Sequence, residues 1–167
     1  MKRYCFDTSG FSNPLEAMPR DIHVKLWDDI IDYIASGNVA VTKEVFDEIV
    51  YISNGIGDFV SANSEKILLE VGETHWDWNR YIAHNRLAQD SYQSFISEFN
   101  KNIKGTIGLT DLSIISLAKT LNIPLVNMES LISEASPSKR RIPNICKYEG
   151  VQSLTFNDFL RKEGFKF

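Results

Sequence analysis

The sequence predicts an α/β protein, a three-layer α/β/α sandwich around a central, mostly parallel sheet. Three short apolar segments have the length and composition of buried strands, at residues 3–7, 38–41 and 123–128, and a last short strand is expected at residues 151–155. Segments with helical spacing separate these strands, for example residues 21–36, where Ile and Leu recur on one face. Strands that alternate with helices are typical of a parallel sheet covered by helices on both faces.

The first elements follow from local signals. The strand at residues 3–7 ends at Asp7, and the sequence Ser-Asn-Pro at residues 12–14 predicts a turn. The helix at residues 21–36 is expected to end before Gly37, a residue typical of helix C-termini. After the second strand, Thr42 is the expected N-cap of a helix over residues 43–52.

The second half of the chain continues the same alternation. Further helices are expected at residues 58–71, 75–99, 111–122 and 156–164. Thr110 is the expected N-cap of the helix at residues 111–122. Loops are expected between these elements, at residues 54–57, 101–109 and 133–143.

Length and composition indicate an ordinary globular protein. The 167 residues suit a single domain spanning residues 1–167. Hydrophobic residues make up 43% and charged residues 24% of the chain, which excludes a disordered composition. No apolar run approaches the roughly 18 residues of a membrane span, and Asp7 interrupts any signal-peptide core. We therefore expect a cytoplasmic protein without a membrane segment.

The net charge and the spacing of His and Cys residues argue against two classes of protein. A net charge of −4 argues against indiscriminate coating of nucleic acid, which needs many Lys/Arg–phosphate contacts. The histidines show no paired spacing and the two cysteines, Cys5 and Cys146, lie far apart, so a zinc site is not expected. An enzyme that meets phosphates through metal ions held by carboxylates remains compatible with this composition.

Carboxylates stand beside the predicted strand ends and helix starts. Asp7 ends the first strand, Asp111 opens a helix, and Glu129 follows the third strand. Glu44 and Glu48 lie in the helix after the second strand, where Glu48 borders the buried face and Glu44 can be solvated. The carboxyl ends of parallel strands share one edge of a sheet, which is where ligands bind in such folds.

Two of the acids also have a structural explanation. Asp111 can cap its helix, and Glu129 can be a solvated loop residue. A carboxylate directly after a buried strand, such as Asp7, is a poor choice for structure alone. Together the acids would repel one another unless a divalent cation neutralised them, and oxygen-only ligands suit Mg²⁺ or Mn²⁺. Such a metal site can hydrolyse phosphodiesters.

The order of these motifs resembles a known nuclease fold. The segments FDTSG, TKEVFDEI and GLTDLSIISLAKTLNIPLVNMES resemble the PIN domain, shared by toxin ribonucleases of bacterial toxin–antitoxin pairs. YCFDTSG, the KEVFDEI helix and RIPNIC resemble more closely a bacterial PIN-like family of largely unassigned function. The resemblance covers nearly the whole chain and rests on the order and spacing of short motifs.

The resemblance implies a Mg²⁺- or Mn²⁺-dependent endoribonuclease that is the toxin of a pair and is blocked by an antitoxin protein. The implied catalytic metal ligands are Asp7, Glu48, Asp111 and Glu129. The fourth ligand is usually Asp in toxin-type members, and Glu129 is one methylene longer. Thr8 and Ser9 match hydroxyl positions that support the site, and Glu44 is a further candidate for support. Gly10 is less typical of this stretch and is expected to widen the turn.

Two surface features are candidates for RNA contacts. Lys139, Arg140 and Arg141 form a compact basic run that can bind RNA phosphates or can be a solvated loop. Trp76, Trp78 and Tyr81, together with Arg80 and Arg86, can stack on unpaired bases or can pack in the core or in an oligomer contact.

Other functions remain open at this point. The same metal chemistry can cut DNA, and a PIN-like module can lack catalysis and serve in binding or regulation. A phosphatase of the haloacid-dehalogenase type needs a second Asp two residues after the first, where this chain has Ser9. Toxin-type PIN proteins are commonly dimers, so a homodimer is also considered.

Overall fold

Four parallel strands form the centre of the fold. The structure, a computed structural model, describes residues 1–53, 55–101, 106–136 and 139–167. The strands are β1 (Tyr4–Phe6), β2 (Val39–Ala40), β3 (Leu125–Val126) and β4 (Ser153–Leu154), in the spatial order β2-β1-β3-β4. All three pairings are parallel, with Cys5 opposite Ala40 on one side and opposite Leu125 on the other. The predicted α/β class and parallel sheet are confirmed.

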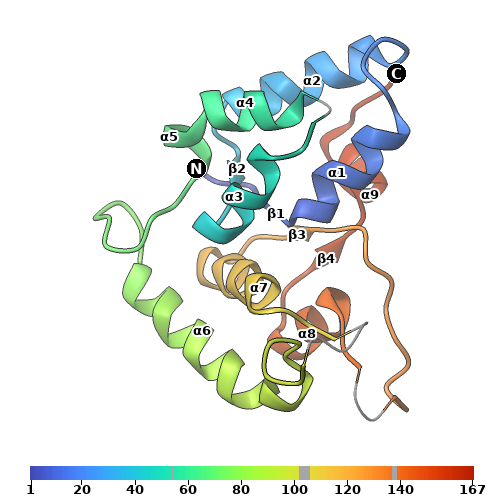
Figure 1. The fold of residues 1–167 in the computed structure, drawn as a ribbon. Helices are drawn as coiled ribbons and strands as arrows, with labels where there is room; N and C mark the ends of the chain where they lie inside the picture. The colour runs from blue at the N-terminus through green and yellow to red at the C-terminus, as the bar shows by residue number, and fades with distance from the viewer. Residues whose placement is uncertain (54, 102–105, 137–138) are drawn as a thin grey trace.

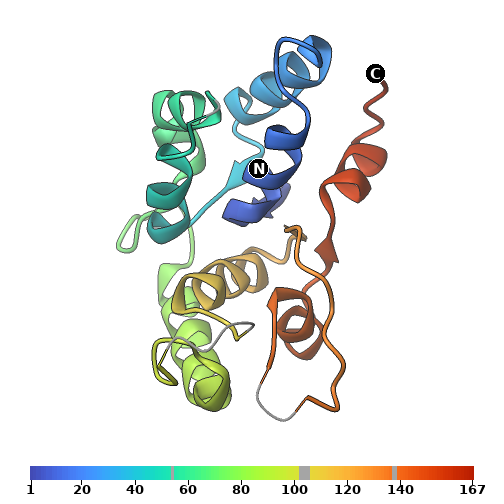
Figure 2. The ribbon, with the colours of Figure 1, turned by 45° about the vertical axis from the view of Figure 1, so that its right-hand side comes forward.

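Helices cover both faces of this sheet. They are α1 (Thr8–Ala17), α2 (Val24–Ala35), α3 (Lys43–Val50), α4 (Ile56–Ala62), α5 (Ser64–Ile67), α6 (Trp78–Tyr92), α7 (Leu109–Leu121), α8 (Ile142–Glu149) and α9 (Phe156–Glu163). In Figure 1, α1 and α2 lie above the strands, and α7 and α8 lie below them. Figure 2 shows the same separation from a second direction, which corresponds to the predicted three-layer sandwich.

The central strand and one helix are buried along most of their length. Tyr4, Cys5 and Phe6 of β1 are all buried, as expected for a parallel strand with helices on both faces. In α7, every residue from Leu112 to Ala118 is buried, because this helix packs against α6 on one side and against the sheet and α8 on others. Most side chains of this buried stretch are apolar, and the two polar ones are serines, Ser113 and Ser116.

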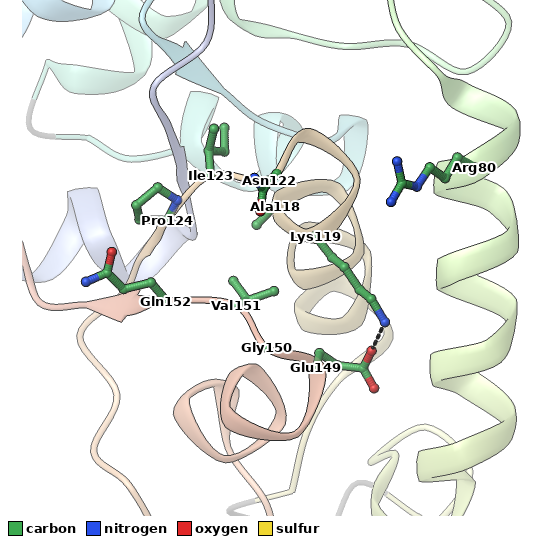
Figure 3. Close-up of a pocket in the computed structure, with 10 residues that line it drawn as sticks. All are labelled: Arg80, Ala118, Lys119, Asn122, Ile123, Pro124, Glu149, Gly150, Val151 and Gln152. Carbon is green, nitrogen blue, oxygen red and sulfur yellow. Dashed lines mark hydrogen bonds and ion pairs between the residues drawn. The ribbon is translucent and has the colours of Figure 1, made fainter.

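Polar links join the helices below the sheet. Lys119 of α7 forms an ion pair with Glu149 of α8, with 2.6 Å between Nζ and Oε2 (Figure 3). Tyr92, the last residue of α6, donates its hydroxyl to the other oxygen of Glu149 over 2.5 Å. Glu149 therefore ties α6, α7 and α8 together.

The predicted turn at residues 12–14 was wrong. These residues lie inside α1, which contains Pro14 and buries Phe11 and Leu15. An internal proline removes one helical hydrogen bond and costs roughly 3 kcal/mol. Burial of the apolar face of α1 against the sheet and the N-cap at Asp7 outweigh that local preference.

Helix α8 was not predicted, since its segment was read as a polar connection followed by a strand. Ile142, Ile145 and Cys146 are buried on one face of this helix at helical spacing. Pro143 occupies the second helical position, where the missing N–H costs little. The neighbouring basic residues concealed this short apolar pattern.

Several boundaries differ from the predicted ones. The helix expected at residues 58–71 is divided into α4 and α5, and the one expected at residues 75–99 ends earlier, followed by a 3₁₀ turn at Gln93–Phe95. The N-cap of α7 is Gly108 rather than Thr110. Parts of the loops expected at residues 54–57, 101–109 and 133–143 lie outside the described residues. Within the described chain, no helix is both long and apolar enough to cross a bilayer.

Candidate carboxylate site at the end of the sheet

The carboxyl ends of β1 and β3 meet at one edge of the sheet. The backbone N–H of Asp7, just after β1, donates to the carbonyl of Val126, the last residue of β3, over 3.0 Å. The chain then enters α1 from Asp7, while after Val126 it continues through Asn127 and Met128 to Glu129. This pairing places the start of α1 and the segment carrying Glu129 side by side.

Asp7 is the buried member of the acidic group, with 5% of its surface exposed. Its Oδ2 accepts two hydrogen bonds from Ser9, one from the backbone N–H over 3.0 Å and one from the hydroxyl over 2.5 Å. Burial raises the pKa of Asp7, the Ser9 hydrogen bonds oppose this rise, and the charges of Glu129 and Glu48 add to it. Asp7 is thus a desolvated carboxyl group in the field of other acids.

Asp111 lies in the first turn of α7 and is half-buried. Its Oδ2 accepts the backbone N–H of Gly108 over 2.7 Å, so its structural role as a helix cap is real. Burial, followed by the charge of Asp7, raises the pKa of Asp111 from 3.8 to about 7, with smaller contributions from Glu129 and Glu48. The four carboxyl groups therefore lie close enough to interact electrostatically, and helix capping alone does not explain Asp111.

Glu48 reaches the site from α3. It is exposed, and its Oε2 accepts the hydroxyl of Thr8 over 2.5 Å. Its charge contributes to the raised pKa of both Asp7 and Asp111. The predicted position at the border of the buried face is thus an open one, where the carboxylate can face solvent or a ligand.

Glu44 faces a different part of the molecule. It is exposed in the first turn of α3. Burial raises the pKa of Tyr81 to about 12, and the charge of Glu44 adds to that rise. Glu44 therefore lies near Tyr81. The carboxylates that raise the pKa of Asp7 and Asp111 are other ones, among them Glu129 and Glu48.

Glu129 is half-buried and is held at both ends. Its Oε2 accepts the backbone N–H of Ile142, at the start of α8, over 2.8 Å. Its own backbone N–H donates to Oδ1 of Asn127 over 3.1 Å, and Nδ2 of Asn127 donates to the hydroxyl of Ser153 over 2.8 Å. Glu129 is therefore no freely solvated loop residue, because it joins β3, β4 and α8.

The four acids share one hydrogen-bonding pattern. One oxygen of each carboxyl group accepts a hydrogen bond. The donors are Ser9 for Asp7, Thr8 for Glu48, Gly108 for Asp111 and Ile142 for Glu129. Among the residues that the structure describes, the second oxygen of each has no hydrogen-bond partner. An all-oxygen donor set of this kind suits Mg²⁺ or Mn²⁺. Within the same residues, however, no three acidic, His or Cys side chains converge closely enough to hold a metal ion as they stand.

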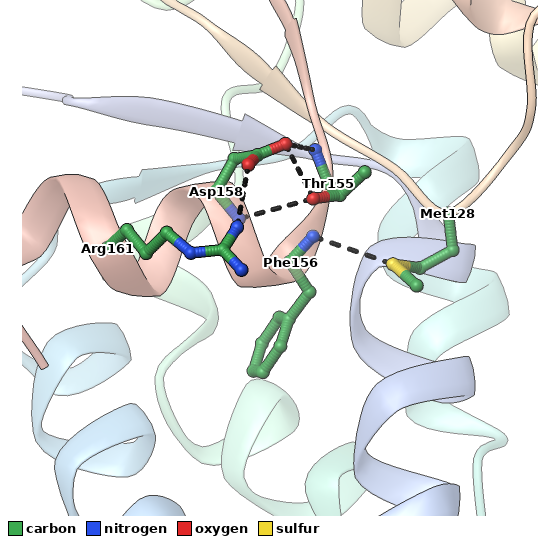
Figure 4. Close-up of polar contacts among 5 residues, drawn as sticks. All are labelled: Met128, Thr155, Phe156, Asp158 and Arg161. Carbon is green, nitrogen blue, oxygen red and sulfur yellow. Dashed lines mark hydrogen bonds and ion pairs between the residues drawn. The ribbon is translucent and has the colours of Figure 1, made fainter. Parts of the chain in front are cut away.

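Ser9 connects the acid at the end of β1 to the segment after β3. Its hydroxyl donates to Asp7 and accepts the backbone N–H of Met128 over 3.1 Å. The sulfur of Met128 in turn accepts the N–H of Phe156 over 3.5 Å, at the capped start of α9 (Figure 4). The hydroxyl at position 9 thus supports Asp7, as the sequence suggested, and also holds the loop that leads to Glu129.

Gly10 has a role other than widening a turn. It lies inside α1, and a Cβ placed on it would stand 2.6 Å from the carbonyl oxygen of Val126. The absence of a side chain allows α1 to approach the backbone of β3 closely. This approach sets the position of Asp7 and Ser9 relative to Glu129.

The basic run lies beside this group of acids, since Arg141 directly precedes Ile142, whose N–H binds Glu129. Lys139 is exposed, and Arg141 is half-exposed. Arg140 is occupied within the protein, because its guanidinium lies 4.6 Å from the ring centre of Phe95 and donates to the carbonyls of Ser136 and Lys139. Lys139 and Arg141 therefore remain the candidates for contacts with phosphates.

The aromatic residues around position 80 pack mainly inside the protein. Tyr81 is buried, and its ring lies 5.4 Å from that of Trp76. The indole N–H of Trp76 donates to the carbonyl of Glu70 over 3.0 Å. Trp76 and Tyr81 are thus used in packing rather than presented to bases.

Two polar residues of the site were not anticipated. Glu98 accepts the N–H of Leu109 over 3.1 Å, so a second carboxylate caps α7 next to Asp111. Asn144, with 1% exposure, binds both the N–H and the C=O of Ile132 and accepts the N–H of Arg141. Nothing in the sequence pointed to Glu98, because its partner Leu109 is brought near it by a loop. Asn144 gave a weak one, as the polar residue between the apolar positions of RIPNIC.

Comparison with known proteins adds a family but no function. The chain matches no curated protein. A family model described as "Domain of unknown function (DUF4411)" matches residues 4–167, which include every strand and all four acids of the site. The chain therefore belongs to the DUF4411 family.

Proposed function

We propose that this protein is a metal-dependent endoribonuclease whose site is the carboxylate group at the end of the sheet. The observation that carries the proposal is the meeting of acids at the carboxyl end of the sheet, where buried Asp7 pairs with the end of β3, which leads to Glu129, and where Thr8 binds Glu48. The pKa of Asp111, raised to about 7 by burial and by Asp7, Glu129 and Glu48, supports this arrangement. These acids come from four separate segments of the chain. Mutual repulsion of this kind is costly unless a cation offsets it, and perturbed acids gather at functional sites.

The protein's own residues have distinct tasks in this proposal. Asp7, Glu48, Asp111 and Glu129 hold Mg²⁺ or Mn²⁺ through the oxygens that have no partner in the described part of the chain. Ser9 orients Asp7, and Thr8 orients Glu48, as supporting hydrogen bonds do around metal ligands. A bound divalent ion would supply an activated water and would stabilise the leaving oxygen of the phosphodiester. Lys139 and Arg141 would bind neighbouring phosphates.

Ion binding requires a rearrangement of side chains. As they stand in the described residues, the acids do not converge on one point. Glu48 and Glu129 have the longest side chains of the group, and Glu48 is exposed, so both can move toward Asp7 and Asp111 by rotamer changes. Such movement would break the hydrogen bonds to Thr8 and Ile142 or transfer them to the other carboxylate oxygen.

The resemblance to PIN nucleases supports RNA as the substrate. It also supports the more specific parts of the proposal, which are a toxin role in the cytoplasm, an antitoxin protein that blocks the site, and a homodimer. The same chemistry can cut DNA. Cleavage of RNA and DNA strands of matched sequence would distinguish the two substrates.

The proposal is tested with purified protein that has been stripped of metal with EDTA. We expect cleavage of single-stranded RNA when Mg²⁺ or Mn²⁺ is added, and a loss of about a hundredfold or more in Asp7→Asn. Asp90→Asn, which neutralises an exposed acid on α6, is the matched control and should retain full activity. Unchanged cleavage by Asp7→Asn would refute the mechanism.

A second candidate function is a binding or regulatory module without catalysis. It is favoured by the hydrogen bond from Ile142 to Glu129, which gives Glu129 a structural role, and by the lack of convergence among the described acids. Calorimetric titration with Mn²⁺ separates the two candidates. Absence of binding, or binding that Asp111→Ala leaves unchanged, would support the module.

A further inference from the structure

A second polar pocket lies at the opposite edge of the sheet from the acids. It has a volume of about 380 Å³ and is enclosed by α6, the C-terminus of α7 and the turn between α8 and β4 (Figure 3). Pro124 and Gln152, which line it, directly precede β3 and β4. Since Asp7 and Glu129 follow the strands, this pocket is separate from the carboxylate site.

Arg80 lines this pocket and extends from α6 toward α7 (Figure 3). Among the described residues, its guanidinium has neither a hydrogen bond nor an ion pair. Arg80 lies in the first turn of α6, after the N-cap Asp77. A cation is unfavourable at that end of a helix, where the dipole favours negative charge. Arg80 is exposed, so its guanidinium is hydrated and is available to a ligand in the pocket.

The negative charge in the pocket is already compensated. Both oxygens of Glu149 are occupied, one by Lys119 over 2.6 Å and the other by the hydroxyl of Tyr92 over 2.5 Å. Arg80 itself has no ion pair among the described residues. Burial lowers the pKa of nearby His84, the positive charges of Lys119 and Arg80 lower it further, and the charges of Glu149 and Asp77 oppose them.

The remaining donors around the pocket belong to side chains. The backbone N–H groups of Asn122, Ile123 and Val151 all donate to carbonyls within the protein. Oε1 of Gln152 accepts from Lys162 over 3.0 Å, so the amide NH₂ of Gln152 is its free end. Because Lys119 is engaged by Glu149, selective binding of an anion would depend mainly on Arg80, with the amide of Gln152 as a further donor.

We propose that this pocket binds a phosphate monoester of nucleotide size, with Arg80 as its principal phosphate ligand. A guanidinium can donate two parallel hydrogen bonds to phosphate oxygens, and such charge-assisted pairs are among the strongest. The volume falls within the range of small-molecule sites, roughly 300–1,000 Å³. Ile123, Pro124 and Val151 offer an apolar wall for the organic part of the ligand.

The test measures binding of AMP, inorganic phosphate and adenosine by calorimetry, with EDTA present so that no metal at the carboxylate site contributes. We expect saturable binding of AMP, weaker binding of phosphate and none of adenosine. Arg80→Gln should weaken AMP binding about tenfold or more, which is the loss of one strong charged contact. Arg86→Gln removes the same charge from an exposed position of α6 outside the pocket and should bind AMP like the natural protein.

A second readout separates this site from the carboxylate site. In amide NMR spectra, AMP should shift the signals of Gly150 and Gln152 and leave those of Ser9 and Met128 unchanged, and Asp111→Asn should retain AMP binding. Four results would overturn the inference: no saturable binding of AMP, equal affinity for AMP and phosphate, equal affinity for AMP and adenosine, or equal weakening by Arg80→Gln and Arg86→Gln. None of these results depends on nuclease activity.

Discussion

The hydroxyl of Ser9 donates to the buried carboxylate of Asp7 over 2.5 Å, two residues away at the start of α1. The same oxygen accepts the N–H of Met128, one residue before Glu129. A single side chain thus fixes the orientation of one acid and the course of the loop that carries another. Asp7 is placed by the end of a strand, and Ser9 determines which of its oxygens is engaged.

Replacement of Ser9 by Ala tests this arrangement. The variant loses the hydroxyl bond to Asp7 and the acceptor for Met128, so we expect Mn²⁺ affinity to fall about tenfold, as for other supporting residues around metals. Stability should fall by about 1 kcal/mol. Calorimetry with Mn²⁺ and urea denaturation measure the two effects.

Ser12→Ala is the matched control in the same helix, since the Ser12 hydroxyl contacts only its neighbour Asn13 among the described residues. It should leave Mn²⁺ affinity unchanged and should not lower stability, since alanine has a higher helix propensity than serine. Equal effects of Ser9→Ala and Ser12→Ala would show that the Ser9 hydroxyl has no special role at the site.

The raised pKa of Asp111 predicts a pH-dependent stability of the metal-free protein. The folded protein keeps the proton of Asp111 to about pH 7, whereas the unfolded chain releases it near 3.8. The folded state therefore binds more protons between these values, and the free energy of unfolding should decrease as the pH rises through this interval. The slope is at most about 1.4 kcal/mol per pH unit for one group.

Urea denaturation in EDTA between pH 4.5 and 7.5 measures this slope. Asp111→Asn should flatten it, because the amide does not ionise and can still accept the N–H of Gly108. Asp7, whose pKa is also raised by burial, would leave a residual slope. Asp90→Asn is the control and should retain the full pH dependence, and an undiminished slope in Asp111→Asn would contradict the electrostatic description of the site.

The strands were the most predictable part of the fold. Each predicted strand segment contains one observed strand. For β1, β2 and β3 the reason is that buried parallel strands appear in the sequence as short continuous apolar runs, whereas β4 is half-buried and lies in the mixed sequence VQSLT. The prediction missed the helices α1 and α8, each for a different reason. In α1 a proline suggested a turn that tertiary burial overrides, and in α8 basic neighbours concealed three buried positions.

The site was predictable only in outline. The positions of Asp7 and Glu129 at strand ends and of Asp111 at a helix start follow from the alternation of elements. Their hydrogen-bond partners do not, since the contacts of Glu98 with Leu109 and of Glu129 with Ile142 depend on loops whose course no local pattern specifies. Long-range loop geometry also decides that Arg140 packs on Phe95 instead of facing a ligand.

The connection between β3 and α8 should depend on Asn144 more than on any other residue. It is buried and makes three hydrogen bonds, two with Ile132 and one with the N–H of Arg141. Asn144→Ala leaves these backbone groups without their partner, so we expect a loss of about 2–3 kcal/mol in the free energy of unfolding. Asn157→Ala, at an exposed position of α9, is the control and should cost less than about 0.5 kcal/mol. A similar cost for both variants would rule out an organising role for Asn144.

Gly10 provides a test in which local and tertiary effects have opposite signs. In an ordinary helix interior, Gly→Ala stabilises by about 1 kcal/mol. At Gly10 the added methyl group would lie 2.6 Å from the carbonyl oxygen of Val126, which belongs to β3 and cannot move without disturbing the sheet. We therefore expect Gly10→Ala to lower the free energy of unfolding by about 1–3 kcal/mol.

The same substitution should also affect the site, because α1 must move away from β3 and would carry Ser9 away from Met128. Mn²⁺ affinity measured by calorimetry should fall in Gly10→Ala even under conditions where the variant is fully folded. Ser12→Ala, on the same helix, again serves as the control for changes in helix propensity. A Gly10→Ala protein as stable as the natural one, with unchanged Mn²⁺ affinity, would show that the close approach of α1 to β3 is not what positions the acids.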